Sequence, residues 1–266
     1  MNLHHDILEA AYPGQSHRFF LPISIGGTPA LADEGAGLIL SGIKTATSSA
    51  FWDYPDGRIP FTAEGRARWA ATPDLTTERI TGTVLGTDRV EDRSLTERCI
   101  TSDSLLVPNA LYNNYHRIVQ APGYVVIVSE NMHDARVVPL GRQPHPGPAI
   151  RQWLGDSRGW WEGSTLVVET TNFAKEVYDP KNGGAMRPNL NRTFTLVERF
   201  TRTGPETLVY EVTVDDPETW VAPWTLQIPL ARDDGYGMFE YACHEGNYAM
   251  KNMLTASRAG ERGAGK

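Results

Sequence analysis

The strongest constraint on the fold is a stretch in which apolar and polar side chains alternate on both sides of a turn. The stretch is RTFTLVERFTRTGPETLVYEVTV, residues 192–214. Its apolar positions are Phe194, Leu196 and Phe200 before the turn, and Leu208, Tyr210, Val212 and Val214 after it. Because successive side chains of a strand point to opposite faces of the sheet, this pattern predicts a β-hairpin with one buried face.

Neighbouring segments repeat this design. The segment RIVQAPGYVVIVSENMHDARVVPL (117–140) predicts short strands separated by Pro-Gly and by a polar turn, and GWWEGSTLVVETTNF (159–173) predicts a hairpin around Glu-Gly-Ser. The segment APWTLQIPLARDDGYGMFEYACHE (222–245) predicts a further hairpin. We therefore expect a mainly β fold, an antiparallel meander closed as a lipocalin-like barrel.

The chain changes character near residue 60. Before it, PALADEGAGLILSGIKT (29–45) has apolar residues at a spacing that fits a helix. We expect four parts: an α-containing fragment at 1–62, a connector of helix and loop at 63–116, the β-barrel at 117–254 and a flexible tail at 255–266.

Charge and targeting signals narrow the partners. The formal net charge is −7, and residues 1–62 hold three basic residues against six acidic ones, so a nucleic-acid partner is not expected. The start, MNLHHDILEAAYPG, has neither a basic n-region nor an apolar h-region, and no run approaches the roughly 18 apolar residues that span a membrane. These features predict a cytoplasmic protein without a membrane partner; the oligomeric state is left open. In such a chain Cys99 and Cys243 are more often free thiols, and whether they pair is left open.

The segment ALADEGAGLILSGIKTATSSAFWDYPDGRIPF (30–61) carries a Gly-x-Lys-Thr-x-Thr run at residues 42–47. A phosphate-binding P-loop is not predicted, because Ile43 separates the second Gly from Lys44. The segment resembles the ASCH family, small PUA-like barrels linked to RNA or modified-nucleoside chemistry. By this resemblance Lys44 and Thr47 are the catalytic residues of an amidohydrolase.

The remainder of the chain carries a second set of motifs: ERCI (97–100), YNNYHRIVQAPGYVVI (112–127), HDARVVPL (133–140), IRQWLGDSRGWWEGSTLVVETTNF (150–173), VERFTR (197–202), VDDPETWVAPW (214–224) and EYACHEGNYAM (240–250). It resembles a large group of functionally uncharacterised bacterial proteins that are often exported. The resemblance implies no particular activity. The two resemblances meet at residues 55–61, which predicts a fusion.

Two clusters combine a histidine with carboxylates. SENMHDAR brings His133 and Asp134 near Glu130, and EYACHEGNY places Glu240 and His244 on one face of the expected strand. The residues His133, Asp134, Glu240 and His244 are therefore predicted to form a catalytic acid–base set. A divalent metal held by both histidines and one glutamate is an alternative, and structural hydrogen bonding is another, because the spacing requires no metal and no cofactor is predicted.

Glu198 lies on the apolar face of the first hairpin, so it needs a partner, which Arg136, Arg158 or a histidine could supply. The predicted substrate-binding residues are Arg136, Asp156, Arg158 and Glu198. The run GDSRG fits G-x-S-x-G around Ser157, but it precedes a strand and not the helix of a nucleophile elbow. A charged pair of Asp156 and Arg158 in a tight turn is therefore preferred.

Three tryptophans, Trp153, Trp160 and Trp161, could stack on an aromatic or sugar ligand, or serve as packing. We therefore expect an enzyme that uses His and carboxylate groups on a small molecule, as a lyase, an isomerase or a hydrolase. A non-catalytic ligand-binding barrel and an ASCH-type RNA or nucleoside protein are the alternatives.

Overall fold

A computed structural model gives the fold over residues 23–24, 37–40, 51–52, 61–71, 89–93, 95–101, 115–174, 193–232 and 235–264. The elements in these ranges are β1 (Ile23–Ser24), β2 (Gly37–Leu40), β3 (Phe51–Trp52), α2 (Ala63–Ala71), η1 (Val90–Asp92), β4 (His116–Ala121), β5 (Tyr124–Ser129), η2 (Asn131–His133), β6 (Ala135–Pro139), β7 (Asp156–Glu162), β8 (Thr165–Thr171), β9 (Thr195–Gly204), β10 (Thr207–Asp215), β11 (Trp224–Ala231) and α4 (Tyr248–Ala264).

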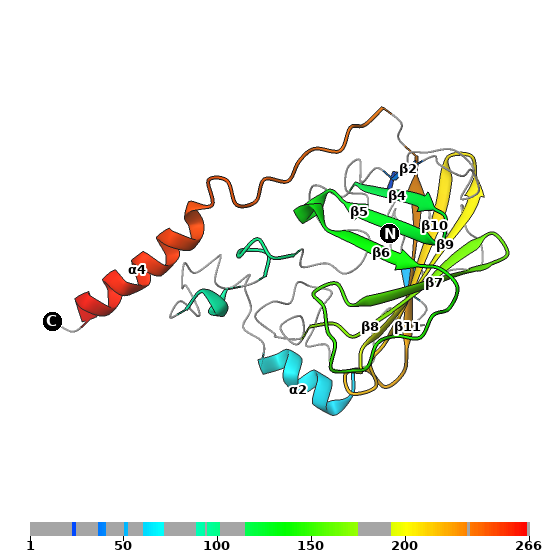
Figure 1. The fold of residues 1–266 in the computed structure, drawn as a ribbon. Coiled ribbons are helices and arrows are strands. Elements are labelled where there is room, and N and C mark those ends of the chain that lie inside the picture. The colour runs from blue at the N-terminus through cyan, green and yellow to red at the C-terminus, as the bar shows by residue number, and fades with distance from the viewer. Residues whose placement is uncertain are drawn as a thin grey trace, which may run out of the picture.

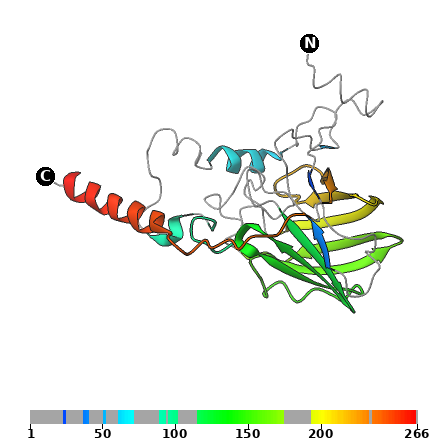
Figure 2. The same cartoon turned by 90° about the horizontal axis from the view of Figure 1, so that it is seen from above.

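The strands form two sheets. The larger has the order β1-β11-β10-β9-β8-β7, with β3 also pairing with β11, and the smaller has the order β2-β4-β5-β6. From β4 to β11, neighbouring strands within each sheet pair antiparallel, so the expected mainly β meander is confirmed. The smaller sheet packs across the concave face of the larger one (Figures 1 and 2).

The two sheets approach each other at the β6–β7 side. Leu140 and Gly159 form an isolated parallel bridge there, and the Gly141 amide donates to the Gly159 carbonyl at 3.0 Å. The strand pairings of the described residues do not close either sheet on itself, so the closed barrel stays a prediction.

The first hairpin forms as its pattern predicts. Phe194, Leu196, Glu198 and Phe200 are buried, and their neighbours in between are half-buried. On the partner strand β10 the buried residues are Leu208, Tyr210, Val212 and Val214, at the expected spacing. These side chains pack with Ile118, Val125, Ile127 and Val138 of the smaller sheet in one hydrophobic core.

The N-terminal part differs from the expectation in one described segment. Gly37–Leu40, expected within a helix, is the strand β2, which pairs antiparallel with β4 through Leu40 and His116 at one end. The pairing stabilises an extended conformation that the local spacing of apolar residues does not indicate, and glycines on both sides weaken a helix. Through β1, β2 and β3 this part of the chain contributes edge strands to both sheets.

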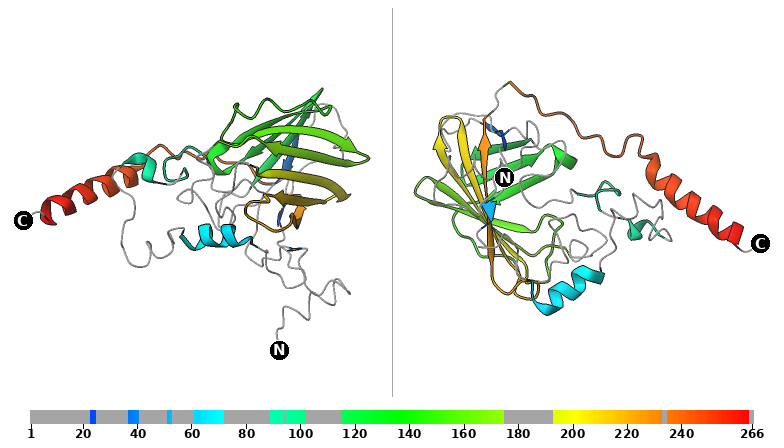
Figure 3. Two further views of the ribbon diagram at one scale, coloured as in Figure 1. Left: turned by 90° about the horizontal axis from the view of Figure 1, so that it is seen from below. Right: turned by 180° about the vertical axis from the view of Figure 1, so that it is seen from behind.

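The C-terminal part also differs. Residues 236–243, expected to be the second strand of a hairpin, lie in no strand, so Glu240 and His244 do not share a strand face. Residues 255–264, expected in a flexible tail, continue the helix α4, which projects away from the sheets (Figure 3). None of the helices in the described part of the chain is long and apolar enough to cross a membrane.

Cys99 and Cys243 form a disulfide, with 5.6 Å between their Cα atoms and a sequence separation of 144. The expectation of free thiols is therefore wrong. It rested on the start of the chain, whereas pairing depends on whether the fold brings the two Cα atoms within reach. The disulfide ties residues 95–101 to the segment before α4.

Candidate functional site

A cavity of about 860 Å³ opens between η2 with the start of β6 and the segment that leads into β7. Its polar lining includes Thr101, His133, Asp134, Arg136, Arg151, Asp156 and Ser157, and its apolar lining includes Met132, Val137, Trp153 and Leu154. Four of the predicted site residues, His133, Asp134, Arg136 and Asp156, thus share one cavity. We name the segment of residues 141–155 the cavity loop.

His133 stands at the end of η2 with a left-handed backbone, φ 44°, directly after Met132 at φ 58°. Non-glycine residues rarely adopt this conformation, although histidine does so more often than most, and strained residues cluster at active sites. The ring nitrogen Nδ1 lies 3.1 Å from the carbonyl oxygen of Tyr241. Because a carbonyl only accepts, Nδ1 donates, and Nε2 of the neutral ring is left as the basic nitrogen.

Tyr241 belongs to residues 235–247, which we name the strap. Glu130, at the end of β5, holds the strap by accepting from the Tyr236 hydroxyl and from the Phe239 amide, both at 2.8 Å. Burial and the hydrogen bond to Glu130 raise the pKa of Tyr236, so its hydroxyl stays a donor. The disulfide fixes the strap two residues beyond Tyr241, so the carbonyl that orients His133 is held at both sides.

Asp134 and Arg136 follow along the same wall. The Thr101 hydroxyl donates to Asp134 Oδ2 at 2.6 Å. Arg136 reaches across the core and donates to both oxygens of Glu198, at 2.5 and 2.8 Å. Arg136 is thus the partner that the buried Glu198 was predicted to need, and the pair joins the two sheets.

Glu198 is fully buried and does not line the cavity. Its Oε1 also accepts from the Tyr210 hydroxyl at 2.9 Å. Burial opposes the charge of Arg136, but Glu198 outweighs it, so the pKa of Arg136 is raised above its usual value. The charge of Arg136 is therefore committed to Glu198.

His116 is buried beside this pair on the inner face of the smaller sheet. Its Nδ1 lies 3.0 Å from the Ser129 hydroxyl. Burial, and to a smaller extent the charge of Arg136, lower the pKa of His116 from 6.5 to about 3. His116 is therefore neutral at physiological pH.

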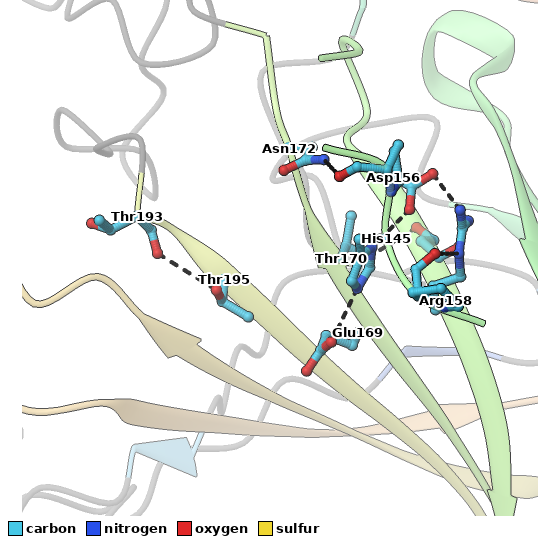
Figure 4. Close-up of polar contacts among 11 residues, drawn as sticks. His145, Asp156, Arg158, Glu169, Thr170, Asn172, Thr193 and Thr195 are labelled. Atoms are coloured by element: carbon cyan, nitrogen blue, oxygen red, sulfur yellow. Dashed lines mark hydrogen bonds and ion pairs between the residues drawn. The ribbon is translucent and has the colours of Figure 1, made fainter. Parts of the chain in front are cut away.

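The opposite wall of the cavity is built on the start of β7. Asp156 Oδ1 lies 2.7 Å from His145 Nδ1, and Asp156 Oδ2 lies 3.0 Å from Arg158 Nη1. The other ring nitrogen of His145 lies 3.0 Å from Glu169 Oε1 on β8 (Figure 4). A neutral imidazole carries one N–H, so both contacts are hydrogen bonds only when His145 is doubly protonated or a carboxyl keeps its proton.

This arrangement settles two expectations about the GDSRG run. Asp156 and Arg158 do pair, but they lie on the strand β7 and not in a turn. Ser157 is also on β7, buried, with its hydroxyl 2.8 Å from that of Thr170. A serine inside an antiparallel strand lacks the sharp strand-to-helix turn of a nucleophile elbow.

The cavity loop is held by hydrogen bonds to neighbouring strands and to residues 172–174. Arg158 donates to the Pro144 carbonyl at 3.3 Å, and Asn172 donates to the Pro146 carbonyl at 2.9 Å (Figure 4). The turn into β7 requires Gly155, which has φ +70° and where a Cβ would lie 2.6 Å from the Thr171 carbonyl oxygen. The loop is therefore positioned before any ligand arrives.

The remaining predicted residues lie elsewhere. Glu240 lines a second, more open cavity beside the strap, together with Glu97 and Glu245, and His244 is exposed and lines neither cavity. The predicted acid–base set is thus divided: His133 and Asp134 lie together, and Glu240 and His244 lie apart from them. Lys44 and Thr47 lie outside the described residues.

The described residues contain no group of three or more His, Cys, Asp or Glu side chains arranged to hold a metal ion. Trp153 lines the cavity and is 38% exposed. The guanidinium carbon of Arg142 lies 4.4 Å from the ring centroid of Trp160, and Trp161 is a partly exposed residue of β7. Of the three tryptophans, Trp153 is thus the one placed to contact a ligand in the cavity.

Several polar residues of the site, His145 and Arg151 among them, are not among the predicted ones. His145 lies in a Pro-His-Pro loop without periodicity, and its carboxylate partners come from two different strands. Arg151 stands two residues before Trp153 in the same loop. The role of His145 depends on the pairing of β7 with β8, which places Arg158 opposite Glu169. The position of Arg151 depends on the bridge between Gln152 and Phe173.

Comparison of the chain with protein-family models, with curated proteins and with solved structures found no match. The two family resemblances described above therefore stay predictions.

Proposed function

We propose that the protein is an enzyme that performs acid–base chemistry on a small organic molecule in the cavity between β6 and the cavity loop. The observation that carries this proposal is the position of His133, which lines the cavity with a strained backbone and with its ring oriented by the Tyr241 carbonyl. A volume of about 860 Å³ is of the size that holds a small ligand.

In this proposal Nε2 of His133 takes a proton from the substrate and returns it at another atom or to a leaving group. An imidazole side chain can both take up and release a proton in general acid–base catalysis. Asp134, next in the chain, supplies negative charge that stabilises the imidazolium formed in this step. Such a step serves a lyase, an isomerase or a hydrolase.

Asp156 has a different role in the proposal. Arg158 and His145 contact it on both oxygens and hold the carboxyl group in place. It is suited to accept a hydrogen bond from a substrate hydroxyl or amine. We further propose that the two sheets close around this cavity as a barrel, as the meander predicts.

A ligand-binding protein without catalysis is the second candidate. It is favoured by the partners that the charged residues already have: Thr101 on Asp134, Glu198 on Arg136, and Arg158 and His145 on Asp156. Such an arrangement shapes a binding site as well as a catalytic one.

Three proteins separate the two candidates: the wild type, His133→Gln and the matched control His244→Gln. Each is incubated in D2O with a pool of small organic acids, esters and sugars, and products and deuterium uptake are followed by mass spectrometry. We expect turnover in the wild type and in His244→Gln, and its loss in His133→Gln. A bound pool member that is neither converted nor labelled by any of the three proteins would support the binding protein instead.

The disulfide supports a proposal about location. Disulfides persist in oxidising compartments and are rare in the reducing cytosol. We therefore propose that the protein works in an oxidising compartment, in place of the cytoplasmic location expected from the start of the chain. Alkylation of intact cells under trapping conditions tests it: Cys99 and Cys243 stay unlabelled if the bond exists in the cell and become labelled if it does not.

A further inference from the structure

We infer that Arg151 and Trp153 form a subsite for an anionic group, a carboxylate above all, carried on a planar or ring-shaped ligand. This inference rests on the proposed use of the cavity as a small-molecule site. It adds the chemical class of the molecule, which the His and carboxylate groups do not specify.

The first argument is the charge of the cavity wall. Two of its charged residues are neutralised by a direct partner: Arg136 by Glu198, and Asp156 by Arg158. Arg151 also lines the cavity, and its Nη1 donates to the Phe173 carbonyl at 3.1 Å. In the part of the chain that the structure describes, no carboxylate pairs with Arg151.

The second argument is the geometry of the guanidinium. It carries five N–H donors, and the bond to Phe173 uses one. That bond fixes the side chain. Among the described residues, none of the remaining N–H groups of Arg151 is a buried donor that lacks a partner. A guanidinium that is held at one edge and open at the other suits bidentate binding of a carboxylate or a phosphate.

The third argument is the apolar surface beside it. Trp153 is 38% exposed and Val137 is 58% exposed, and both line the cavity. Water-exposed apolar side chains at the mouth of a cavity gain from covering a flat ligand, and an indole face stacks on rings. A ring with an acidic substituent satisfies both features of the subsite.

Three probes of equal shape test the inference: benzoate, benzamide and benzylamine, titrated against the full chain by ligand-observed NMR. The proteins are the wild type, Arg151→Gln, Arg151→Lys, Trp153→Ala and the matched control Arg142→Gln, which changes an exposed arginine outside the cavity. Thermal melting of each variant confirms that it is folded.

We expect wild type and Arg142→Gln to bind benzoate at least about tenfold more tightly than benzamide, as one charge-assisted contact provides. Arg151→Gln removes this preference, Arg151→Lys retains part of it, and Trp153→Ala weakens both probes without changing their ratio. Equal binding of benzoate and benzamide, stronger binding of benzylamine, or no binding of any probe overturns the anionic subsite. The D2O assay on His133→Gln judges the proposed function separately, because His133 is not changed in this series.

Discussion

Replacing Glu198 by alanine leaves the guanidinium of Arg136 in the core without its carboxylate. The two groups make two hydrogen bonds, with the Glu198 side chain fully buried and that of Arg136 12% exposed. Breaking a buried ion pair by removing one partner costs about 3 to 5 kcal/mol, because the charge that remains is uncompensated. We expect Glu198→Ala and Arg136→Met each to lower the free energy of unfolding by this amount.

The double variant Arg136→Met with Glu198→Leu should behave differently. It removes both charges together, and an apolar replacement of a buried ion pair is often neutral or stabilising. We expect its free energy of unfolding to lie within about 2 kcal/mol of the wild type, which corresponds to a coupling of several kcal/mol between the two positions. Tyr210→Phe, which removes one hydrogen bond to Glu198, should cost about 1 kcal/mol.

Urea denaturation followed by circular dichroism measures these values, with the slope of each transition compared between variants. The matched control is Arg199→Met, because Arg199 pairs with Glu162 at 2.8 Å where both side chains are partly exposed, and such a surface pair contributes little to stability. A cost below about 1 kcal/mol for Glu198→Ala, or single costs that simply add in the double variant, would refute the buried pair.

Three further predictions concern the core, the tether and the cavity loop. In the unfolded chain His116 binds a proton below its usual pKa of 6.5, whereas in the folded protein it does so only near pH 3, so the free energy of unfolding falls as the pH drops through this window. Between pH 7 and pH 5 the wild type should lose about 2 kcal/mol more than His116→Gln in urea titrations. Equal losses in the two proteins would contradict the buried neutral ring. The double variant Cys99→Ser/Cys243→Ser should have a free energy of unfolding about 2 to 4 kcal/mol lower than that of the oxidised wild type. Alkylation of both thiols in the native, unreduced protein would show that the disulfide does not exist. Gly155→Ala should cost about 2 to 3 kcal/mol because the new Cβ meets the Thr171 carbonyl oxygen and Thr170, while Gly163→Ala, also at positive φ but in open space, should cost about 1 kcal/mol; equal costs in thermal or urea melts would show that the close approach at Gly155 has no effect.

The strands β4, β5, β9 and β10 were predictable because their burial alternates with a period of two, which a hairpin with one buried face imposes on its sequence. The hairpin of β7 and β8 was indicated by its Glu-Gly-Ser turn, because three consecutive residues of β8 are buried. The same alternation places Glu198 in the core, so the sequence predicts that its carboxylate needs a charged or hydrogen-bonding partner. The alternation does not distinguish among Arg136, Arg158 and a histidine as that partner. That choice depends on how the two sheets pack, since Arg136 comes from the opposite sheet. A pattern within one strand carries no information about the neighbouring sheet.

The site was predictable in part: Asp156 and a run of residues close in sequence were placed correctly in the cavity. His133, Asp134 and Arg136 come from one short run, and the fold keeps them together on one wall. Glu240 and His244 were expected on the second strand of a hairpin at 222–245, whereas the strap is held by Glu130 and by the disulfide and does not pair with a neighbouring strand. His145 left no signal, because its role arises from carboxylates on two paired strands.

The account depends most on His133 as the group that moves protons in the cavity. The most direct test is the comparison of His133→Gln with His244→Gln in the D2O assay, after both variants are shown to melt like the wild type. We predict that conversion or deuterium uptake is present in His244→Gln and absent in His133→Gln. Activity retained in His133→Gln, or lost equally in both variants, would contradict the assignment of the site.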